Sequence, residues 1–570
     1  MHVPHDYRAV VSGLCGATWL LGLWYAAPLI QPLRTRPQRA AATMALGCML
    51  PLVLGFVHLL YGWSLWIVLG LIVAARAALT RRGRIEAVTP EGRLWDLLVG
   101  FGVLVALAWP VAVRPTLDGD TLIYHLPNAA SWVAQHGIWT TGTRYWWYPP
   151  ASELFGAGLL ATGGINVIGW AGILPGALLL LTVREAGRRL GAPPLAGTLM
   201  ACALLATPVA AVQLVSLQND LWLASLFLFT LTEYALPAFG TLALTKPYGI
   251  LYALVASLTC RERWRVISAL AVSIAAIGVW VLRDVVLLPH AIVPLGTSAG
   301  ETNLGTTIAA HFPHSLVVLA TASWHAGVVW TLLFAAGLLA IPFSRDGRLR
   351  WGALAATIFF SIIPTAYSGG PVQQLATGAS LRFALPVAAA GLVWMLAFER
   401  RVRAVLAAAA GIGSLIGIGV QWQLFRNDAT TNDTPAIVAA VVLAVAASFL
   451  LTNDRLRIAV YAALFLVLGG LAGGLAGSHP ADYIADRYGG AFAFVSSERI
   501  DRVVTLGLPA GAAITVDPRI AAYDGLDEGT CGEAKAVNAV IVASTDRLRS
   551  LACVRILYRD ARTAVIDPRD

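Results

Sequence analysis

Two carboxylates separated by a single glycine follow directly on a long apolar run and precede a tyrosine and a histidine. The segment reads Leu117-Asp118-Gly119-Asp120-Thr121-Leu122-Ile123-Tyr124-His125-Leu126-Pro127. A carboxylate in this position is suited to general-base chemistry, in which it takes a proton from an attacking hydroxyl group. Asp120 and Tyr124 lie at a helical spacing, so a short helix beginning near Asp120 would present both side chains on one face.

The spacing leaves a second interpretation open, in which Asp120 only caps that helix and Asp118 is a solvated turn residue. The loop that follows favours a reaction site, because it is rich in Trp and Tyr from Trp139 to Tyr148 and is followed by Glu153. Aromatic rings suit the faces of sugars, although Trp and Tyr also form belts at membrane interfaces.

Three cationic side chains fall at the ends or breaks of apolar runs further along the chain. Lys246 is one of two lysines in the protein, and it stands in an otherwise apolar stretch where a charge is costly without a partner. Arg283 ends an apolar run, and Arg382 opens another. Either arginine alone could extend to the membrane interface, but together the three side chains could hold an anionic phosphate at the membrane surface.

These side chains must be positioned by membrane-spanning helices. Of the 570 residues 58% are hydrophobic and 12% are charged, against about 25% charged in an ordinary soluble domain. The mean hydropathy is +0.72, and the apolar runs are long enough to cross a bilayer, which takes roughly 20 residues of helix. The net charge of +9 comes from short arginine clusters between these runs, which indicates membrane topology and no nucleic-acid partner.

Seven basic breaks define the topology, since basic loops stay on the cytoplasmic side. With those breaks inside, we predict a polytopic α-helical membrane protein with about 14 full spans. The stretch 237–260 must cross an even number of times but is too short for two spans. We therefore expect two half-length helices that meet near Lys246 and Pro247. The breaks are Arg34–Arg39, Arg81–Arg93, Arg184–Arg189, Arg261–Arg265, Arg345–Arg350, Arg400–Arg403 and Arg455–Arg457.

This topology predicts a plasma (inner) membrane protein whose loop 114–164 and C-terminal region face away from the cytoplasm. We expect three N-terminal helices in residues 1–96, a membrane catalytic region in 97–477, and a small soluble α/β domain in 478–570. Cys531 and Cys553 stand together in that last region. They either form a disulfide in the extracytoplasmic space or remain two free thiols.

Five segments resemble, in their order and membrane side, motifs of the GT-C superfamily of polyprenyl-phosphate-sugar glycosyltransferases, in its branch of bacterial protein mannosyltransferases and lipopolysaccharide sugar transferases. The resemblance covers roughly residues 97–400 and implies a GT-C-like bundle. Three spans precede the one that normally opens that fold, Asp284 stands where Asn is usual, and His290–Pro294 matches loosely. The segments are Asp120–Pro127, Tyr148–Pro150 with Glu153, Leu244–Pro247, Arg283–Asp284 with Pro294–Leu295, and Arg382–Pro386.

The resemblance implies transfer of a sugar, with inversion, from a polyprenyl-phosphate donor to an extracytoplasmic hydroxyl group of an envelope glycan, lipid or protein. Asp120 would be the catalytic base, and Asp118 would orient the acceptor or share the proton. No metal or other cofactor is obligatory, because the leaving phosphate already faces three cations. A divalent cation on Asp118 and Asp120 stays open.

The same resemblance assigns the remaining site residues of a bacterial cell-envelope enzyme. The donor phosphate would be stabilised by Arg283, Lys246 and Arg382. His125 carries a further possibility, since a lone histidine is more often a hydrogen-bonded packing residue. The substrate would be bound by Tyr124, His125, Arg144, Tyr148 and Glu153.

Two other classes of function fit part of the pattern. A transporter or flippase of a lipid-linked or anionic substrate would explain charges within spans, with the broken element lining its pathway. It does not explain the acidic and aromatic loop of about 50 residues, which is longer than ordinary connections. A non-catalytic scaffold that binds lipid-linked sugar would keep the aromatic loop but would not need Asp120.

Overall fold

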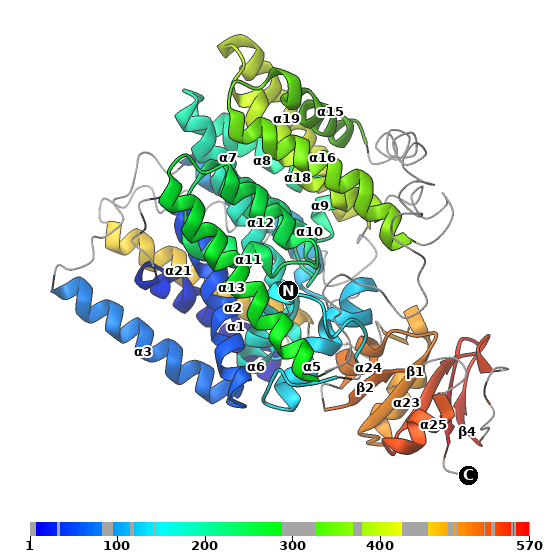
Figure 1. Cartoon of the computed structure of the whole chain (residues 1–570). Helices are drawn as coiled ribbons and strands as arrows, with labels where there is room; N and C mark the ends of the chain where they lie inside the picture. Colours follow the sequence, from blue (N-terminus) through cyan, green and yellow to red (C-terminus); the bar gives the residue numbers. More distant parts are fainter. Residues whose placement is uncertain are drawn as a thin grey trace.

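The computed structural model shows a mostly helical, multi-pass membrane protein with a small C-terminal sheet domain at one end of the helical bundle (Figure 1). It describes residues 7–30, 33, 35–82, 95–114, 119–141, 143–287, 327–368, 379–424, 454–476, 484–485, 487–517, 519–525, 530–548, 551 and 555–568. Within them, six helical segments are long and apolar enough to cross a membrane. These are Tyr7–Leu29, Arg36–Phe56, Gly62–Arg81, Ile165–Arg189, Arg263–Leu287 and Arg400–Gln421.

The apolar runs predicted as spans contain a helix wherever they fall within the described residues. One of these predicted spans, 435–452, lies outside them. The helical elements are α1 (Tyr7–Ala26), η1 (Ala27–Leu29), α2 (Arg36–Phe56), α3 (Gly62–Arg81), α4 (Trp95–Ala112), η2 (Thr121–His125), α5 (Leu126–Ala134), α6 (Ala151–Gly163), η3 (Ile165–Gly172), α7 (Ile173–Arg189), α8 (Pro194–Leu205), α9 (Pro208–Ala211), α10 (Asp220–Thr232), α11 (Leu236–Ala243), α12 (Gly249–Leu258), α13 (Arg263–Leu287), α15 (Val328–Phe343), α16 (Gly347–Ser368), η4 (Ala379–Ala384), α18 (Leu385–Leu396), α19 (Arg400–Leu424) and α21 (Asp454–Ala476).

Several of these helices are shorter than the spans expected from the apolar runs. The apolar run 195–214, which the sequence predicts as one span, is divided into α8 and α9, because Pro208 opens a new helix instead of continuing the first one. The broken element is present as α11 and α12, which end and begin on either side of Lys246 and Pro247. Among the described residues, seven apolar helices of 10–17 residues accompany the six long ones. A multi-span helical protein is therefore confirmed, and the number of about 14 full spans stays a prediction.

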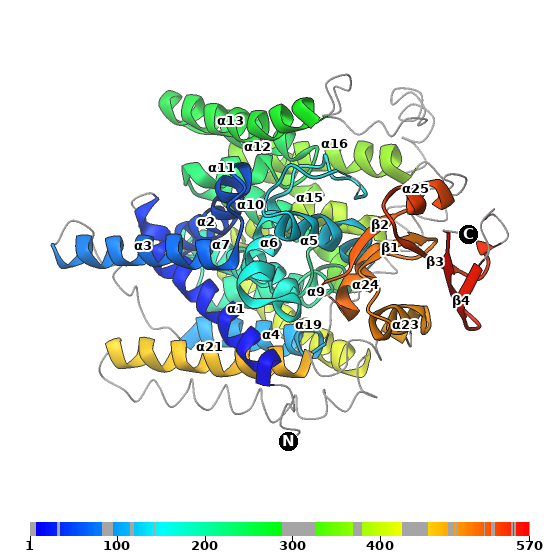
Figure 2. The same ribbon diagram turned by 90° about the horizontal axis from the view of Figure 1, so that it is seen from below.

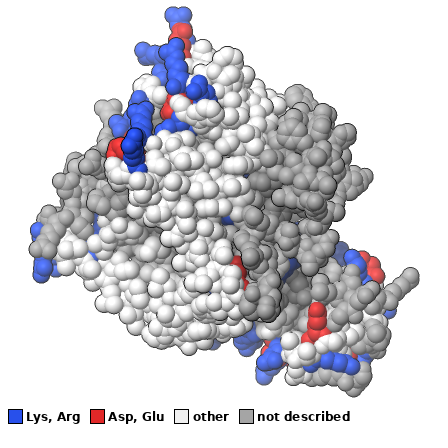
Figure 3. All heavy atoms as spheres, viewed as in Figure 1, with Lys and Arg blue, Asp and Glu red and all other residues white. Residues whose placement is uncertain are grey.

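Several segments that the sequence places in the cytoplasm meet at one end of the bundle, which we call the basic end. Glu233, which follows α10, pairs with Arg189 at the end of α7 and accepts a hydrogen bond of 3.3 Å from the Gln38 amide in α2. Arg348 donates to the Thr230 carbonyl at 2.7 Å. On the face in Figure 3, the charged side chains gather at this end and on the C-terminal domain, with a broad uncharged band between them.

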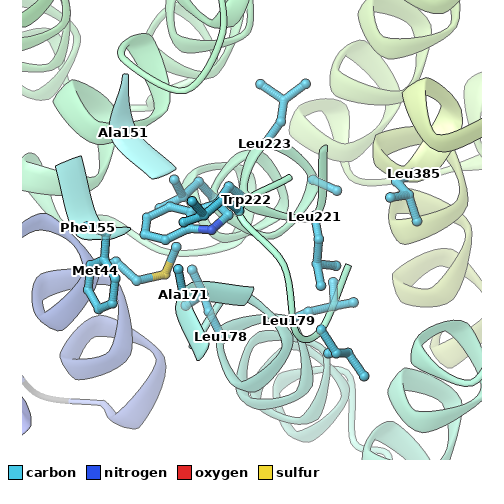
Figure 4. Packing of buried hydrophobic residues seen from close by; sticks show 14 of the residues in the cluster. Met44, Ala151, Phe155, Ala171, Leu178, Leu179, Leu221, Trp222, Leu223 and Leu385 are labelled. Atoms are coloured by element: carbon cyan, nitrogen blue, oxygen red, sulfur yellow. The ribbon is translucent and has the colours of Figure 1, made fainter. Parts of the chain in front are cut away.

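The interior of the bundle is filled by large apolar side chains from distant parts of the sequence. Met44 of α2, Phe155 of α6 and Trp222 of α10 lie side by side in this core (Figure 4). The rings of Phe155 and Trp222 meet edge to face with 5.4 Å between centroids. Close packing also uses glycine: a Cβ on Gly13 of α1 would lie 2.0 Å from the carbonyl oxygen of Gly469 in α21, so these two helices cross with backbones in contact (Figure 2).

The C-terminal domain has a five-stranded mixed sheet with the strand order β2-β1-β3-β5-β4. Strands β1, β2 and β3 are parallel, and β5 runs antiparallel to β3 and β4. Cys531 is disulfide-bonded; Cys553, the other cysteine considered for that bond, lies outside the described residues. The elements are α23 (Ala491–Ser497), β1 (Arg502–Leu506), α24 (Ala510–Val516), β2 (Ala521–Asp524), α25 (Thr530–Ala536), β3 (Val540–Ser544), β4 (Arg555–Arg559) and β5 (Thr563–Asp567).

Helix α24 of this domain packs directly against η2, the turn that follows Asp120. The closest approach is at Gly511, where a Cβ would lie 2.5 Å from the Leu122 carbonyl oxygen and 2.8 Å from the Leu122 Cα. Because those neighbours are backbone atoms, they cannot rotate away as a flexible side chain would. The C-terminal domain therefore supports the backbone of η2, and only glycine fits at this contact.

Replacing Gly511 with alanine is expected to separate α24 from η2. Overpacking of this kind costs about 1 to 3 kcal/mol, and the backbone amides of 121–134 should exchange their hydrogens faster as the support loosens. Gly532→Ala in α25 is the matched control, because its Cβ would meet nothing within 4 Å. Equal hydrogen exchange of 121–134 in the two variants would show that α24 does not support η2.

Candidate functional site

The segment that begins at Asp120 forms a helical turn, as the sequence predicts, but Asp120 does not cap it. Residues Thr121–His125 make one π-helical turn that continues into α5, and the Asp120 side chain makes no capping hydrogen bond to it. Instead the Asp120 carboxylate pairs with the Arg382 guanidinium, with 2.5 Å between Oδ2 and Nη1. Pairing with a cation from another helix, and no capping bond, favours the site interpretation over the local one.

Four side chains of alternating charge form a continuous chain at this place. Arg382 also lies 3.4 Å from the Asp220 carboxylate, measured from Nε to Oδ2, and Asp220 in turn pairs with Lys246. The order is therefore Asp120, Arg382, Asp220, Lys246, and we call these four residues the charge chain. The side chains of Asp120 and Arg382 are 27% and 23% exposed, whereas Asp220 and Lys246 are 2% and 8% exposed. One end of the chain is open to solvent and the other is buried.

The buried end lies well inside the bundle. Asp220 opens α10, a helix of 13 residues that spans about 20 Å at 1.5 Å per residue and ends beside Glu233 at the basic end. Lys246 sits in the break between α11 and α12, with its ammonium 4.6 Å from the Phe383 ring centroid and 5.5 Å from that of Tyr248. Aromatic faces on two sides and one carboxylate thus satisfy a cation that would otherwise be costly at this depth.

Neighbouring charges keep Asp120 ionised. Burial by itself would raise the pKa of the Asp120 carboxyl, but Arg382 and then His125 and Lys246 outweigh that effect and bring the pKa below its ordinary value. Tyr124 behaves in the opposite way, because burial and then the Asp120 carboxylate raise its pKa well above the usual value. The site therefore offers an anionic acceptor of protons beside a phenol that keeps its proton.

His125 and Glu153 form a buried pair next to the charge chain. The His125 Nδ1 atom lies 2.8 Å from Glu153 Oε1, and each side chain is 1% exposed. The Ser152 hydroxyl donates to the other Glu153 oxygen at 2.9 Å. Among the described residues no partner faces the second ring nitrogen of His125. The contact with Glu153 fixes the orientation of the imidazole ring.

Three tyrosines form an aromatic wall above this pair. The Tyr124 ring meets the Tyr145 and Tyr148 rings edge to face, at centroid distances of 5.2 Å and 6.3 Å. Tyr145 and Tyr148 stack on each other at 4.6 Å. Arg144 is exposed and contacts this wall at its edge, with the guanidinium 5.1 Å from the Tyr145 ring centroid. The structure therefore brings Tyr124 and Tyr148 together and places Arg144 against Tyr145 on the exposed side.

Arg283 is held by the external loop and is absent from the described contacts of the charge chain. Its side chain is fully buried, and it donates to the carbonyls of Ile138, Trp146 and Thr140 at 2.7, 3.1 and 2.9 Å. It also pairs with Asp284 at 2.7 Å. Because these partners use its N–H groups, the geometry favours a positioning role that fixes loop 114–164 on α13, and direct binding of phosphate by Arg283 stays a prediction.

The other predicted carboxylate, Asp118, lies outside the described residues. The described residues contain no group of three or more His, Cys, Asp or Glu side chains that could hold a metal ion. Because one of its two suggested ligands is not described, a divalent cation on Asp118 and Asp120 stays an open prediction.

Asp220 is the site residue that sequence reasoning missed. It stands at the start of an apolar run after Gln218 and Asn219, and nothing in its spacing connects it to residue 120. A signal was nevertheless present, because a lysine in an apolar stretch requires a carboxylate nearby. In the structure this carboxylate is Asp220. The Asn219 side-chain amide donates to the Thr245 carbonyl at 3.0 Å, which holds the start of α10 against the break between α11 and α12.

The structure is similar over most of its length to ArnT from Cupriavidus metallidurans. Against the crystal structure of ArnT bound to undecaprenyl phosphate, identity is 17% and the TM-score 0.49, covering 84% of this chain and 98% of that chain. Against apo ArnT the values are 16%, 0.47, 83% and 97%. No protein-family model and no curated protein matches the chain. A likeness of this degree assigns neither activity nor substrate.

Proposed function

We propose that this protein is a membrane glycosyltransferase that moves a sugar from a polyprenyl-phosphate donor to a hydroxyl group on the extracytoplasmic side of the plasma membrane. The observation that carries the proposal is the charge chain. Its exposed end joins a carboxylate of the external loop to an arginine at a helix end, and its buried end holds a lysine inside the bundle. This arrangement supports Asp120 as the base and Arg382 as a phosphate-binding group beside it.

The chemistry follows from these two groups. The acceptor oxygen attacks the anomeric carbon from the face opposite the phosphate, its proton passes to the Asp120 carboxylate, and the bond between carbon and phosphate oxygen breaks with inversion. The polyprenyl phosphate leaves with the additional negative charge. Arg382 and Lys246 would stabilise that charge, an effect that is often the largest in such sites.

Arg382 would also make donor binding precede activation of the base. In the structure Arg382 is shared between Asp120 and Asp220, and this pairing makes Asp120 a weak base. A donor phosphate that binds Arg382 would withdraw it from Asp120 and raise the pKa of that carboxyl. The carboxylate then becomes a stronger base only when the donor is in place.

The aromatic wall and the pair of His125 and Glu153 complete the proposed site. Tyr124 and Tyr148 offer rings for the sugar face, and the Tyr124 phenol supplies a hydrogen-bond donor. Asp118 would orient the acceptor, which belongs to the class of envelope glycans, lipids or proteins. Undecaprenyl phosphate, the ligand in the ArnT crystal structure, belongs to the chemical class that we propose for the leaving group.

The test uses the full chain in proteoliposomes with tritiated polyprenyl-phosphate sugars and a cell-envelope extract as acceptor. We expect release of free polyprenyl phosphate together with transfer of the label to the extract. Heat-denatured protein is the control. Donor that crosses the bilayer unchanged would instead identify a transporter or flippase, and donor that binds but stays intact on its own side would identify a scaffold.

A further inference from the structure

Two arginines lie together at the basic end of the three N-terminal helices, far from the charge chain. Arg39 belongs to the first turn of α2, and Arg76 to the last turns of α3. The Arg39 Nε donates to the Trp24 carbonyl at 2.9 Å, and its guanidinium lies 4.9 Å from the Trp24 ring centroid. The Arg76 guanidinium lies 4.1 Å from the Tyr25 ring centroid. The ends of α1, α2 and α3 thus bring two cations to adjacent aromatic residues.

These two cations have no carboxylate partner in the described part of the chain. Arg76, which has the same sign, acts on Arg39, and the other titratable group near Arg39 is the Tyr25 phenol. Arg76 is 7% exposed, and its Nε and Nη1 groups are buried without a hydrogen-bond partner there. Another buried arginine at this end is neutralised, since Arg184 pairs with Asp96. The buried Arg76 guanidinium, with unsatisfied donors and a second like charge nearby, is unfavourable unless an anion joins the two cations.

The chemistry of this place fits the phosphate of a lipid. A phosphate offers several oxygens to guanidinium groups, which bind it through paired hydrogen bonds. Helix α3 exposes Trp63, Ile67 and Leu71 along its length, and Tyr25 is itself 37% exposed. The site therefore opens toward the apolar surface that acyl chains cover, and it lies at the membrane side where anionic lipids attract basic segments.

We propose that Arg39 and Arg76 bind the phosphate of an anionic phospholipid at the cytoplasmic ends of α1, α2 and α3. The lipid joins two helices whose cations repel each other in its absence. The three N-terminal spans thereby acquire a role that is separate from the charge chain, and the site serves neither as donor nor as acceptor site of the transfer reaction.

Native mass spectrometry of the detergent-purified full chain tests the site, with phosphatidylglycerol, phosphatidylcholine and inorganic phosphate as probes. We expect retained phosphatidylglycerol, and an at least tenfold weaker occupancy in Arg76→Gln and Arg39→Gln. Arg81→Gln is the matched control, because Arg81 is exposed near the end of the same helix. Equal occupancy in all variants, equal retention of phosphatidylcholine, or displacement of the lipid by millimolar phosphate would overturn the proposal.

A second measurement keeps the test valid if a variant is unstable. Arg76→Met keeps an unbranched side chain but removes one of the two like charges. In detergent without anionic lipid we expect this variant to unfold at a higher temperature than the wild type, and we expect added phosphatidylglycerol to raise the wild-type Tm but not that of the variant. A lower Tm for Arg76→Met in the absence of lipid would mean that the pair is already neutralised within the protein, and the proposal would fail.

Discussion

Replacing Asp120 with asparagine is expected to lower the rate of sugar transfer by about 10² to 10⁴-fold, the usual contribution of a positioned general base. Asparagine is close to isosteric but cannot take the proton of the acceptor hydroxyl. Binding of the donor should persist, because Arg382 and Lys246 remain and lose a competing anion. Turnover with a tritiated donor and retention of the unlabelled donor on the purified protein measure the two effects separately.

Asp501→Asn serves as the control, since it removes an exposed carboxylate of the C-terminal domain that is not part of the charge chain. An Asp120→Asn protein that transfers sugar at the wild-type rate would exclude Asp120 as the base. Loss of both donor binding and turnover would instead show that Asp120 is required for the structure of the site.

The pH dependence of the wild type follows from the same carboxylate. The pKa of Asp120 in the folded, donor-free protein lies below its ordinary value, so this group stays ionised at pH 5 to 8. Its ionised form stabilises the folded protein above the unfolded pKa of about 4, and this contribution is lost as the pH falls through the lower folded value. Fluorescence-monitored unfolding between pH 3 and 7 should show a smaller loss of stability on acidification in Asp120→Asn.

Breaking the pair of Asp220 and Lys246 is expected to have the second large effect. Asp220→Asn leaves the Lys246 ammonium buried without its counter-ion, which costs about 3 to 5 kcal/mol of stability and abolishes transfer. The double variant Asp220→Asn with Lys246→Met removes both charges and should recover most of that stability, since an apolar replacement of a buried pair is often neutral. Transfer should not recover. Thermal unfolding and turnover of the three proteins provide the comparison.

A second buried pair provides the matched control. Arg184 and Asp96 lie at the basic end of the bundle and are bonded through Arg184 Nε and, at 3.2 Å, Nη2. The double variant Asp96→Asn with Arg184→Met should be folded and should keep its transfer activity. If the double variant at Asp220 and Lys246 is equally active, that pair serves stability alone and the proposed phosphate site loses its buried member.

The parts of the fold that the sequence predicts are those fixed by local chemistry. A proline beside the only lysine in an apolar run predicts the break between α11 and α12, because both residues are unfavourable inside a membrane-spanning helix. Asp120 and Tyr124 are close in sequence, so their position on one turn follows from helical spacing. The boundaries of the three predicted domains, at 96/97 and 477/478, stay predictions.

What the sequence does not reveal depends on contacts between distant residues. Asp120 and Asp220 share Arg382, yet the three residues come from three separate elements whose approach no periodicity predicts. Arg283 has the residue type and the position of a phosphate ligand. Besides its sequence neighbour Asp284, its partners are main-chain carbonyls, which every residue carries and which no pattern of side chains can indicate.

The contact between Gly511 and Leu122 has a consequence for biosynthesis. Nearly 390 residues separate the two positions, so at 5–20 residues per second the ribosome needs roughly 20 to 80 seconds to make the second after the first. During that time the turn that carries the reactive carboxylate has no support from α24. The turn therefore gains this support only after the last segment of the chain has been made, and a chain truncated before α24 should insert into the membrane without the proposed transfer activity.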